Sequence, residues 1–411
     1  MRGIPSLITD IRKKVFTEVA RMAYAGGDYS KAEDLPYIIV PGDQPLHRES
    51  VFLERAIAGE RVRLAMGLSI RPIQTRSLMT EGMDAAAVAE QYYEPPLINI
   101  IPYACHACPT NQYKVCNYCQ NCIAASCQKV CPVGAISFRN NRSYIDLDKC
   151  IRCGKCAKAC PYNAIVHLER PCAAACGMDA IGSDEHGRAV INQDKCVACG
   201  QCLVSCPFGA IVDKGQIFQV IQSILKGDQV IAIVAPAFIG PCAAKKLEAS
   251  RRTVRSEVDF VLTFEELRGM FEAKAIDFNQ IEDAPANYEA SAPGVGFAAG
   301  GGVAAAVEEV IRRTNPELEV KTVSAMGLNE CRKMLRIART GKYDGYLLEG
   351  MACPGGCITG AGTIQPPEKA QRLLAQYKAA SPKSNPLDTD YLEDLELIYE
   401  DPEDWKSVSQ H

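Results

Sequence analysis

Apolar residues recur at helical spacing near the start of the chain, in a segment flanked by charges. This pattern predicts an amphipathic helix, and a second helix is predicted over residues 49–68. Neither segment groups side chains of catalytic chemistry, so residues 1–100 are expected to form a helical region for packing or docking. The single histidine there, His47, is interpreted as a surface or core residue rather than a cluster ligand. The positions that share the first apolar face are Ile11, Val15, Val19 and Met22.

After about residue 213 the pattern changes to short, continuously apolar runs between helical segments, which is typical of an α/β domain. The glycine-rich stretch 294–302 lacks the spacing of a dinucleotide or phosphate loop, so a turn that enters a helix is expected there. The expected strands are 230–235, 258–264 and 344–348, and the expected helices are 303–313 and 329–340.

The overall composition narrows the class of partner. Of the 411 residues, 47% are hydrophobic and 23% are charged, and 49 acidic against 45 basic residues give a net charge of -4. This balance gives no electrostatic reason to expect nucleic acid or an anionic membrane. No apolar run approaches the roughly 18 to 20 residues that a membrane span needs, and no signal core precedes residue 30. We therefore expect no membrane insertion, a cytoplasmic location, and proteins or small molecules as partners.

The 21 cysteines carry the strongest signal. In the cytoplasm such dense cysteine use indicates metal or cofactor binding rather than disulfides. Four segments repeat the ending Cys-x3-Ala-Ile, which indicates an internal repeat, and each Ala-Ile is expected to begin a short strand beneath a cluster. The four segments are 131–136, 160–165, 176–181 and 206–211.

Two copies of the run Cys-x2-Cys-x2-Cys-x3-Cys-Pro are typical of bacterial ferredoxins, in which the fourth cysteine ligates the other cluster. They predict two [4Fe-4S] clusters, one held by the first three cysteines of the first run with Cys206, the other by the first three of the second run with Cys160. Zinc bound by paired Cys-x2-Cys motifs is the alternative, but zinc does not require the third cysteine and the proline. The runs are Cys150, Cys153, Cys156, Cys160 and Cys196, Cys199, Cys202, Cys206.

Nine more cysteines lie in the same region and can supply the ligands of one or two further [4Fe-4S] clusters. Four of them form a degenerate copy of the ferredoxin run, and two form half of another. The alternatives are inert buried thiols or a small zinc site. The nine are Cys105, Cys108, Cys116, Cys119, Cys122, Cys127, Cys131, Cys172 and Cys176.

Two later segments carry a resemblance to a known family. Residues 241–248 read PCxxKxxE, and residues 349–360 read ExMxCxxGCxxG. With the ferredoxin runs before them, they resemble the second and third signatures of the [FeFe] hydrogenases. The resemblance implies an H-cluster, in which a [4Fe-4S] cubane is joined through a cysteine thiolate to a diiron unit.

The resemblance also implies a role for each matching residue. Gly355 and Gly356 would let the backbone approach the metal closely, since glycine has no Cβ. The implied roles are Cys242 and Cys353 as cubane ligands, Cys357 as the bridging thiolate, Lys245 as the donor to a cyanide, Glu248 on the proton path, and Met351 over the diiron unit.

The family's first signature, TSCCP, is missing. No Cys-Cys pair occurs in the chain, and the apolar run ending at Gly240 passes directly into the second signature. By the resemblance, the implied cubane would lack one thiolate and the diiron site would lack its proton-passing thiol, so impaired hydrogen turnover is expected. Cys331 is an alternative fourth ligand, but its helical context favours an inert buried thiol.

The sequence thus predicts an α+β ferredoxin-like multi-cluster domain followed by an incomplete α/β [FeFe]-hydrogenase catalytic domain. Three functions remain open: a hydrogenase-family oxidoreductase, a polyferredoxin-like electron carrier, and a hydrogen-sensing relative. The expected partner is a redox protein, such as a ferredoxin or an electron-transfer subunit. The expected divisions are 1–100 (helical), 101–214 (ferredoxin-like), 215–365 (partial H-cluster domain) and 366–411 (C-terminal helix and acidic tail).

The C-terminal division begins with an amphipathic stretch, residues 370–377, and continues into a strongly acidic tail. The tail is interpreted as a solvated surface arm, with a docking arm for a partner as the alternative. Its acidic residues include Asp388, Asp390, Glu393, Asp394 and Glu396.

Overall fold

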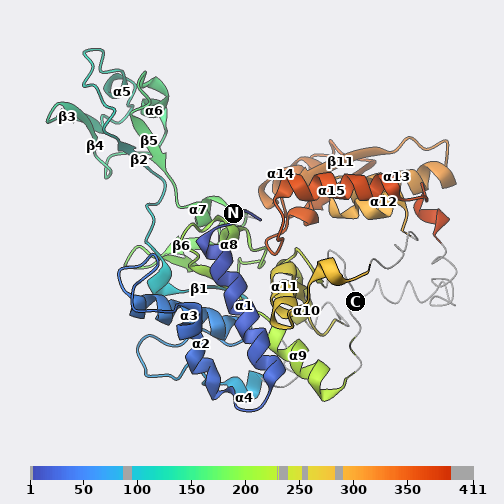
Figure 1. Cartoon of the computed structure of the whole chain (residues 1–411). Helices are drawn as coiled ribbons and strands as arrows, with labels where there is room; N and C mark the ends of the chain where they lie inside the picture. The colour runs from blue at the N-terminus through green and yellow to red at the C-terminus, as the bar shows by residue number, and fades with distance from the viewer. Residues whose placement is uncertain are drawn as a thin grey trace.

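The computed structural model places a body of helices and short strands from which one small lobe projects (Figure 1). The expected strand 230–235 and the acidic tail beyond Thr389 lie outside the described residues, apart from Val230 itself. None of the described helices is both long and apolar enough to cross a membrane. The described residues are 3–86, 95–228, 230, 239–251, 258–282 and 290–389.

Both helices predicted near the N-terminus are present. Helix α1 (Leu7–Ala25) begins at a capping box in which the hydroxyl of Ser6 accepts the N–H of Thr9, and these caps satisfy otherwise unpaired N–H groups. Helix α3 (Val51–Ala65) begins at Ser50. They share one core with α9 (Ile217–Lys226) and α11 (Phe264–Ala273). The shorter elements between them are η1 (Tyr29–Asp34), α2 (Leu35–Ile39) and α4 (Met83–Ala86).

The cysteine-rich region forms two ferredoxin-type units rather than one. We call residues 97–108 together with 170–213 the host unit. In it β1 pairs antiparallel with β8, β6 pairs with β7, and α7 packs against α8. Its elements are β1 (Ile98–Ile100), α7 (Pro171–Ala174), β6 (Ile181–Ser183), β7 (Ala189–Ile191), α8 (Gln201–Ser205) and β8 (Ile211–Asp213).

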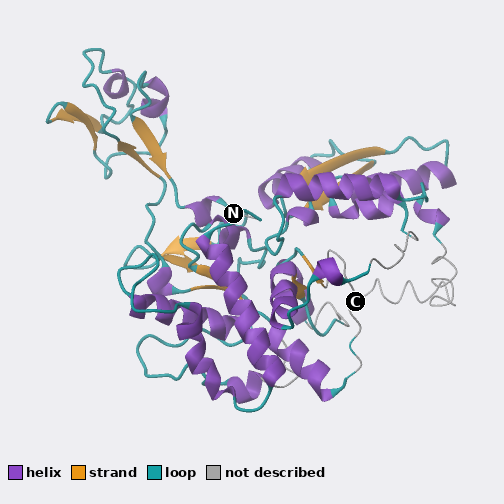
Figure 2. Ribbon diagram, viewed as in Figure 1, coloured by secondary structure: helices purple, strands orange, loops and turns teal. Residues whose placement is uncertain are grey.

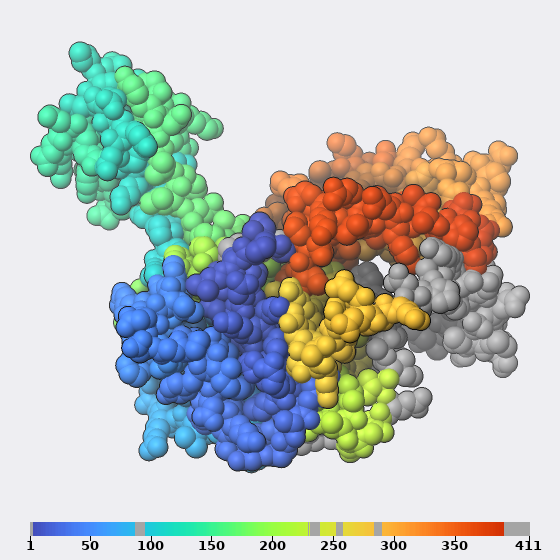
Figure 3. All heavy atoms as spheres, in the orientation of Figure 1, coloured from blue at the N-terminus to red at the C-terminus, as the bar shows by residue number. Residues whose placement is uncertain are grey.

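The second unit, residues 109–169, interrupts the first, and we call it the inserted unit. Strand β2 pairs antiparallel with β5, β3 pairs with β4, and α5 packs against α6. This is the same arrangement as in the host unit, and the unit forms the projecting lobe seen in Figure 3. Its elements are β2 (Gln112–Val115), α5 (Ser126–Lys129), β3 (Ile136–Arg139), β4 (Arg142–Ile145), α6 (Lys155–Ala159) and β5 (Ile165–Leu168).

Each unit has its own hydrophobic core. The core of the inserted unit contains Ile136, Ile145 and Ile165 and draws only on residues of that unit. The core of the host unit contains Ile98, Ile101 and residues of α3 but none from residues 109–169. The four strands expected to follow Ala-Ile all begin at that isoleucine, as β3, β5, β6 and β8.

The remaining chain holds two separate pairs of parallel strands (Figure 2): β9 and β10 lie beside α11, which packs on α1, and β11 and β12 lie beside α13 and α14. The strand expected at 258–264 is short, because a capping box at Thr263 starts α11 there, and the strand expected at 344–348 lies two residues later. The expected helices are present as α13, α14 and α15. The elements are β9 (Ile239–Gly240), α10 (Ala244–Ser250), β10 (Leu262–Thr263), α12 (Ala292–Val295), α13 (Gly302–Thr314), β11 (Lys321–Met326), α14 (Leu328–Ala338), β12 (Tyr346–Met351) and α15 (Pro367–Ala380).

Candidate iron-sulfur centres

The repeated Cys-x3-Ala ending has a common local geometry. The backbone N–H of the alanine donates to the cysteine Sγ, at 3.3 Å for Cys131, 3.4 Å for Cys160 and 3.3 Å for Cys176. A donor aimed at the sulfur favours the thiolate that a cluster needs, and hydrogen bonds to sulfur tune cluster potentials. These turns are therefore shaped for cluster ligands.

In the inserted unit, Cys131 lies with the first three cysteines of the first ferredoxin run. These four line one small apolar cavity with Val133 and Ile151. Burial raises the pKa of the Cys156 thiol, and the nearby Cys150 and Cys131 thiols add to this rise. The set comprises Cys131, Cys150, Cys153 and Cys156.

In the host unit, Cys176 takes the equivalent place beside the second run. Burial raises the pKa of Cys196, Cys199 and Cys202, and the neighbouring Cys176 contributes to each rise. The set comprises Cys176, Cys196, Cys199 and Cys202.

A third set joins cysteines from both sides of the insertion. Cys105 and Cys108 precede the inserted unit, Cys172 follows it, and Cys206 ends the second run, yet all four line one cavity. Burial raises the pKa of Cys172 to about 11, with contributions from Cys206 and Cys105. The insertion therefore divides a single four-cysteine site in the sequence without dividing it in space.

The repeat places a fourth set in the inserted unit. The N–H of Ser143 donates to Cys119 Sγ at 3.4 Å, and the N–H of Ala189 donates to Cys105 Sγ at 3.4 Å. Ser143 and Ala189 occupy the same position in their hairpins. Ser143 lies two residues before Ile145, which pairs with Ile136 at the start of β3. Ala189 lies two residues before Ile191, which pairs with Ile181 at the start of β6. Cys119 therefore corresponds to Cys105. By the same correspondence Cys122, Cys127 and Cys160 match Cys108, Cys172 and Cys206.

The predicted pairing of the two runs is wrong. Cys206 lies with Cys105, Cys108 and Cys172, not with the Cys150 run, and the place expected for Cys160 is taken by Cys176. The physical reason is that ligands cross between the two halves of one ferredoxin unit, and the insertion puts the two complete runs in different units. Cys116 stands apart, since its equivalent in the host unit is Ile101: the Cys116 N–H donates to the Ala164 carbonyl as the Ile101 N–H donates to the Ala210 carbonyl.

Arg170 connects the two ends of the host unit between which the inserted unit begins and ends. Its side chain is buried, and its guanidinium donates to the carbonyl oxygens of Cys108, Gly182 and Gly187 at 2.6–3.3 Å. A fixed fork of donors suits such a cluster of carbonyls. No sequence pattern indicates this role, because an arginine beside cysteines resembles any other surface cation.

The cysteines of the two hydrogenase-like segments come together beside the host unit. The Cys242 thiol lies near the Cys357 thiol. Burial raises the pKa of Cys357, and the nearby Cys242 adds to this rise. Cys353 is buried and accepts a hydrogen bond from Gln201 Nε2 at 3.6 Å. The loop 353–356 closes with a bond from the Gly356 N–H to the Cys353 carbonyl. We call Cys242, Cys353 and Cys357 the three-cysteine site.

The other residues implied by the resemblance do not complete an H-cluster. Lys245 Nζ is paired with the Glu248 carboxylate at 2.7 Å on a partly exposed face of α10. Met351 ends β12 half-buried, and its carbonyl accepts from the Cys331 thiol at 3.5 Å. That thiol also reaches the carbonyl of Ala325, so Cys331 is held as a half-buried hydrogen-bonded thiol. Three thiolates without a fourth do not fit the complete centre.

The glycines of the third signature have a role in packing. Gly356 has φ of +94°, and a Cβ there would lie 2.5 Å from the backbone N of Gly300. The glycine-rich stretch is indeed a turn into a helix, since α13 begins at Gly302. Glu349 fixes this helix end, because its carboxylate accepts the Val303 N–H at 3.1 Å and the Ser324 hydroxyl at 2.8 Å.

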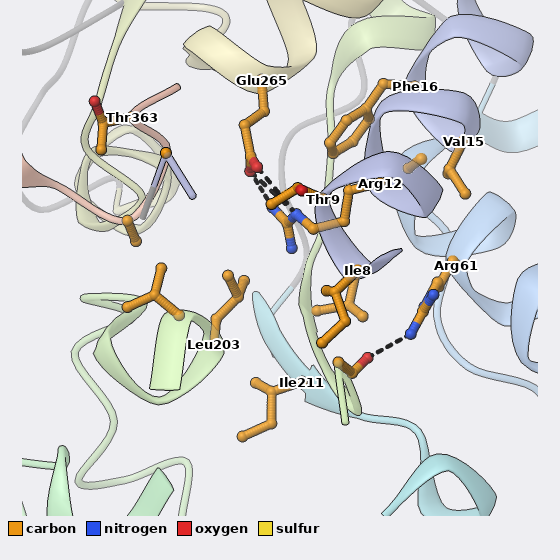
Figure 4. Close-up of a pocket in the computed structure, with 16 residues that line it drawn as sticks. Ile8, Thr9, Arg12, Val15, Phe16, Arg61, Leu203, Ile211, Glu265 and Thr363 are labelled. Carbon is orange, nitrogen blue, oxygen red and sulfur yellow. Dashed lines mark hydrogen bonds and ion pairs between the residues drawn. The ribbon is translucent and has the colours of Figure 1, made fainter. Parts of the chain in front are cut away.

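A buried ion network ties the host unit to the helices around it. Lys246 Nζ lies 2.7 Å from the carboxylate of Asp213 and 2.9 Å from that of Glu266, and all three are buried. Arg12 reaches Glu265 at 2.5 Å (Figure 4). It also reaches Asp213, at 3.4 Å. The network joins α1, β8, α10 and α11. Sequence reasoning missed it, because Lys246 stands beside the motif lysine.

Comparison with known families finds a hydrogenase-like domain and 4Fe-4S binding domains in the chain. The family model described as iron only hydrogenase large subunit, C-terminal domain, matches residues 219–361, and the 4Fe-4S binding domain matches residues 143–166 and 189–212. Each of the two 4Fe-4S matches covers the second half of one ferredoxin-type unit.

Several curated proteins are similar over part of their length. A ferredoxin of Methanocaldococcus jannaschii is 50% identical over 48 residues, 12% of this chain and 29% of the relative. Protein NAR1 of Arabidopsis thaliana is 27% identical over 198 residues, 36% of this chain and 42% of the relative. Cytosolic iron-sulfur assembly component 3 of Pongo abelii is 28% identical over 175 residues, which is 33% of this chain and 37% of the relative.

The chain spans less than half the length of these relatives. The matches nevertheless follow the structure, with the ferredoxin motifs in the two units and the hydrogenase match over the three-cysteine site. This chain is therefore an iron-sulfur protein with two 4Fe-4S binding segments and an incomplete, hydrogenase-like C-terminal part.

Proposed function

We propose that the chain is an electron-transfer protein in which four [4Fe-4S] clusters relay electrons between a redox partner and the three-cysteine site. Each cysteine set supplies four ligands, the number that a [4Fe-4S] cubane takes. The proposed ligand sets are Cys119, Cys122, Cys127, Cys160; Cys131, Cys150, Cys153, Cys156; Cys105, Cys108, Cys172, Cys206; and Cys176, Cys196, Cys199, Cys202.

One contact carries this proposal. Gln201 lies between two proposed ligands of the host unit, Cys199 and Cys202, and its side chain donates to Cys353 of the three-cysteine site. The last cluster of the relay would therefore stand against that site. The clusters supply one-electron chemistry, and this chain's own residues hold them, hydrogen-bond their sulfurs and exclude water. Three relatives carry the word cytosolic in their names, which supports the cytoplasm as the compartment.

Paired cysteine substitutions test the ligand sets. Cys131→Ser with Cys153→Ser is expected to lower the iron content by one cluster, about four irons, because both serve the same cubane. Cys206→Ser with Cys153→Ser is expected to remove two clusters, about eight irons. Iron and sulfide analysis after anaerobic reconstitution measures both losses. The control, Cys116→Ser, should leave the iron content unchanged.

The reverse pattern, with one cluster lost in the second pair and two in the first, would restore the crossed pairing of the two runs. Zinc in place of iron after anaerobic purification would refute the clusters themselves.

The likeness to cytosolic iron-sulfur assembly component 3 supports a second candidate function, the hand-over of a cluster from the three-cysteine site. Three thiolates hold a cubane with one iron open to another ligand. Incubating the reconstituted chain with an apo-ferredoxin distinguishes the two functions. Cluster transfer would favour assembly, whereas reduction and reoxidation with a constant iron content favours electron transfer.

A further inference from the structure

The two units carry the same cluster loop in different surroundings. Residues 150–156 and 196–202 share their cysteine spacing, and their backbones agree: Arg152 and Ala198 have φ of +61° and +51°. Position by position, Ile151, Arg152 and Lys155 of the inserted unit stand where the host unit has Val197, Ala198 and Gln201. The loops can therefore be compared directly.

In the host unit this loop is covered by the site it is proposed to serve. Ala198 is 3% exposed and Gln201 is 8% exposed. The Gln201 amide bonds Cys353, and a Cβ on Gly200 would lie 2.5 Å from the Cβ of Ala361. The loop is thus a docking face that is already occupied within the chain.

In the inserted unit the same loop faces solvent. Ile151 is 59% exposed, and Cys153, Arg152 and Lys155 are exposed as well. The inserted unit therefore presents to solvent the loop that the host unit covers. The equivalence of the loops indicates that this face also docks, onto another molecule.

Charge indicates what kind of molecule. The inserted unit contains eight basic and three acidic residues, which leaves 37 basic and 46 acidic residues for the rest of the chain. Of these cations Lys149 has a carboxylate partner, Asp146 at 3.8 Å, and no other ion pair of this unit occurs among the described residues. The cations are Lys114, Lys129, Arg139, Arg142, Lys149, Arg152, Lys155 and Lys158.

The loop of the inserted unit is exposed and cationic, and its equivalent in the host unit is covered by another part of the chain. We therefore propose that residues 150–158 are the docking face for an acidic electron-transfer protein. The proposal rests on the proposed relay, since it names the partner of its outermost cluster. Complementary charge steers such encounters and mainly affects the association rate. One electron leaves the reduced partner and enters one [4Fe-4S] cluster of the inserted unit; no bond forms or breaks, and no proton is required.

Charge reversal at this face tests the proposal. Full-length reconstituted protein would be mixed in a stopped-flow instrument with a reduced, acidic two-cluster ferredoxin as the probe. Arg152→Glu/Lys155→Glu is expected to slow cluster reduction roughly tenfold or more at low salt. Lys155→Glu/Lys158→Glu, which leaves the residues between Cys150 and Cys153 unchanged, provides a second test. The matched control, Arg336→Glu/Lys342→Glu, makes the same charge change at exposed positions of the C-terminal part and should leave the rate unchanged.

The outcomes separate this inference from the relay itself. If excess dithionite reduces no cluster in any variant, the proposed function fails. If dithionite reduces the clusters fully but both charge reversals keep the unmodified rate, the docking face is wrong. Tighter binding of duplex DNA than of the ferredoxin at the same ionic strength would also overturn it, because the cations would then serve nucleic acid.

Discussion

Expressed together with the maturation factors of the [FeFe] hydrogenases, this chain is expected to evolve hydrogen about a hundredfold to ten-thousandfold more slowly than an intact family member. That range is the typical cost of losing a group that transfers protons in the transition state. The family's proton-passing cysteine belongs to the absent first signature. Hydrogen evolution from reduced methyl viologen measures the rate.

The geometry of the remaining groups points the same way. Lys245 and Glu248, which the resemblance places at a cyanide and on a proton path, are paired with each other. Cys331 donates its thiol to two backbone carbonyls instead of serving as a fourth ligand. Infrared spectroscopy of the matured protein provides the second readout. Carbon monoxide and cyanide bands together with hydrogen evolution at the family's rate would contradict this prediction.

The Lys246→Met variant is expected to lose about 3–5 kcal/mol of folding stability, the usual cost of breaking a buried ion pair. Lys246 stands between the Asp213 and Glu266 carboxylates, and the substitution leaves both buried without it. Anaerobic urea unfolding followed by circular dichroism measures the loss. The adjacent Lys245→Met is the matched control, since its partly exposed pair is expected to contribute less than about 1 kcal/mol.

The network also predicts a pH dependence. Burial by itself would lower the pKa of Lys246, but Asp213 and Glu266 raise it, so its stabilisation is lost only as the pH rises above about 10. Burial would raise the pKa of Asp213, but Lys246 and Arg12 hold it below its usual value, so its stabilisation is lost as the pH falls below about 4.

Without the lysine the buried Asp213 carboxylate should take up a proton at a higher pH, because Lys246 is the main group that lowers its pKa. The stability difference between Lys246→Met and the unmodified chain should therefore shrink as the pH falls from 7 toward about 5. A difference that stays constant over this range would mean that Lys246 acts through packing rather than charge.

Much of the fold follows from local sequence. The Ser6 and Ser50 caps and the apolar faces behind them set α1 and α3, and the Ala-Ile endings set four strands at their first residue. These signals are local, because a cap or a strand start depends on a few neighbouring residues. The strand starts at 262 and 346 were displaced, because the Thr263 capping box and the turn before Tyr346 determine where those elements change.

The arrangement of the clusters could not be obtained in the same way. Cysteine spacing identifies ferredoxin runs, but it does not say which run belongs to which unit when one unit interrupts another. The pairing of Cys105 and Cys108 with Cys172 and Cys206 spans the whole insertion, and only tertiary structure reveals it. The degenerate run 119–131 and the half run of Cys172 and Cys176 were the sequence signals for two units, since each belongs to the first half of a ferredoxin-type unit. Arg170 and Lys246 were missed because burial, not residue type, defines their roles.

The nested arrangement of the four clusters is tested most directly by excising the inserted unit. Residues 109–169 would be replaced by a short glycine linker, which is feasible because Arg170 holds the carbonyl of Cys108 at 3.0 Å. Iron and sulfide are then compared with the full chain after anaerobic reconstitution. The nested arrangement predicts a loss of two clusters, about eight irons, with two reducible [4Fe-4S] clusters retained in the host unit. Loss of every reducible cluster would contradict it, because the host unit would then depend on cysteines of the inserted unit.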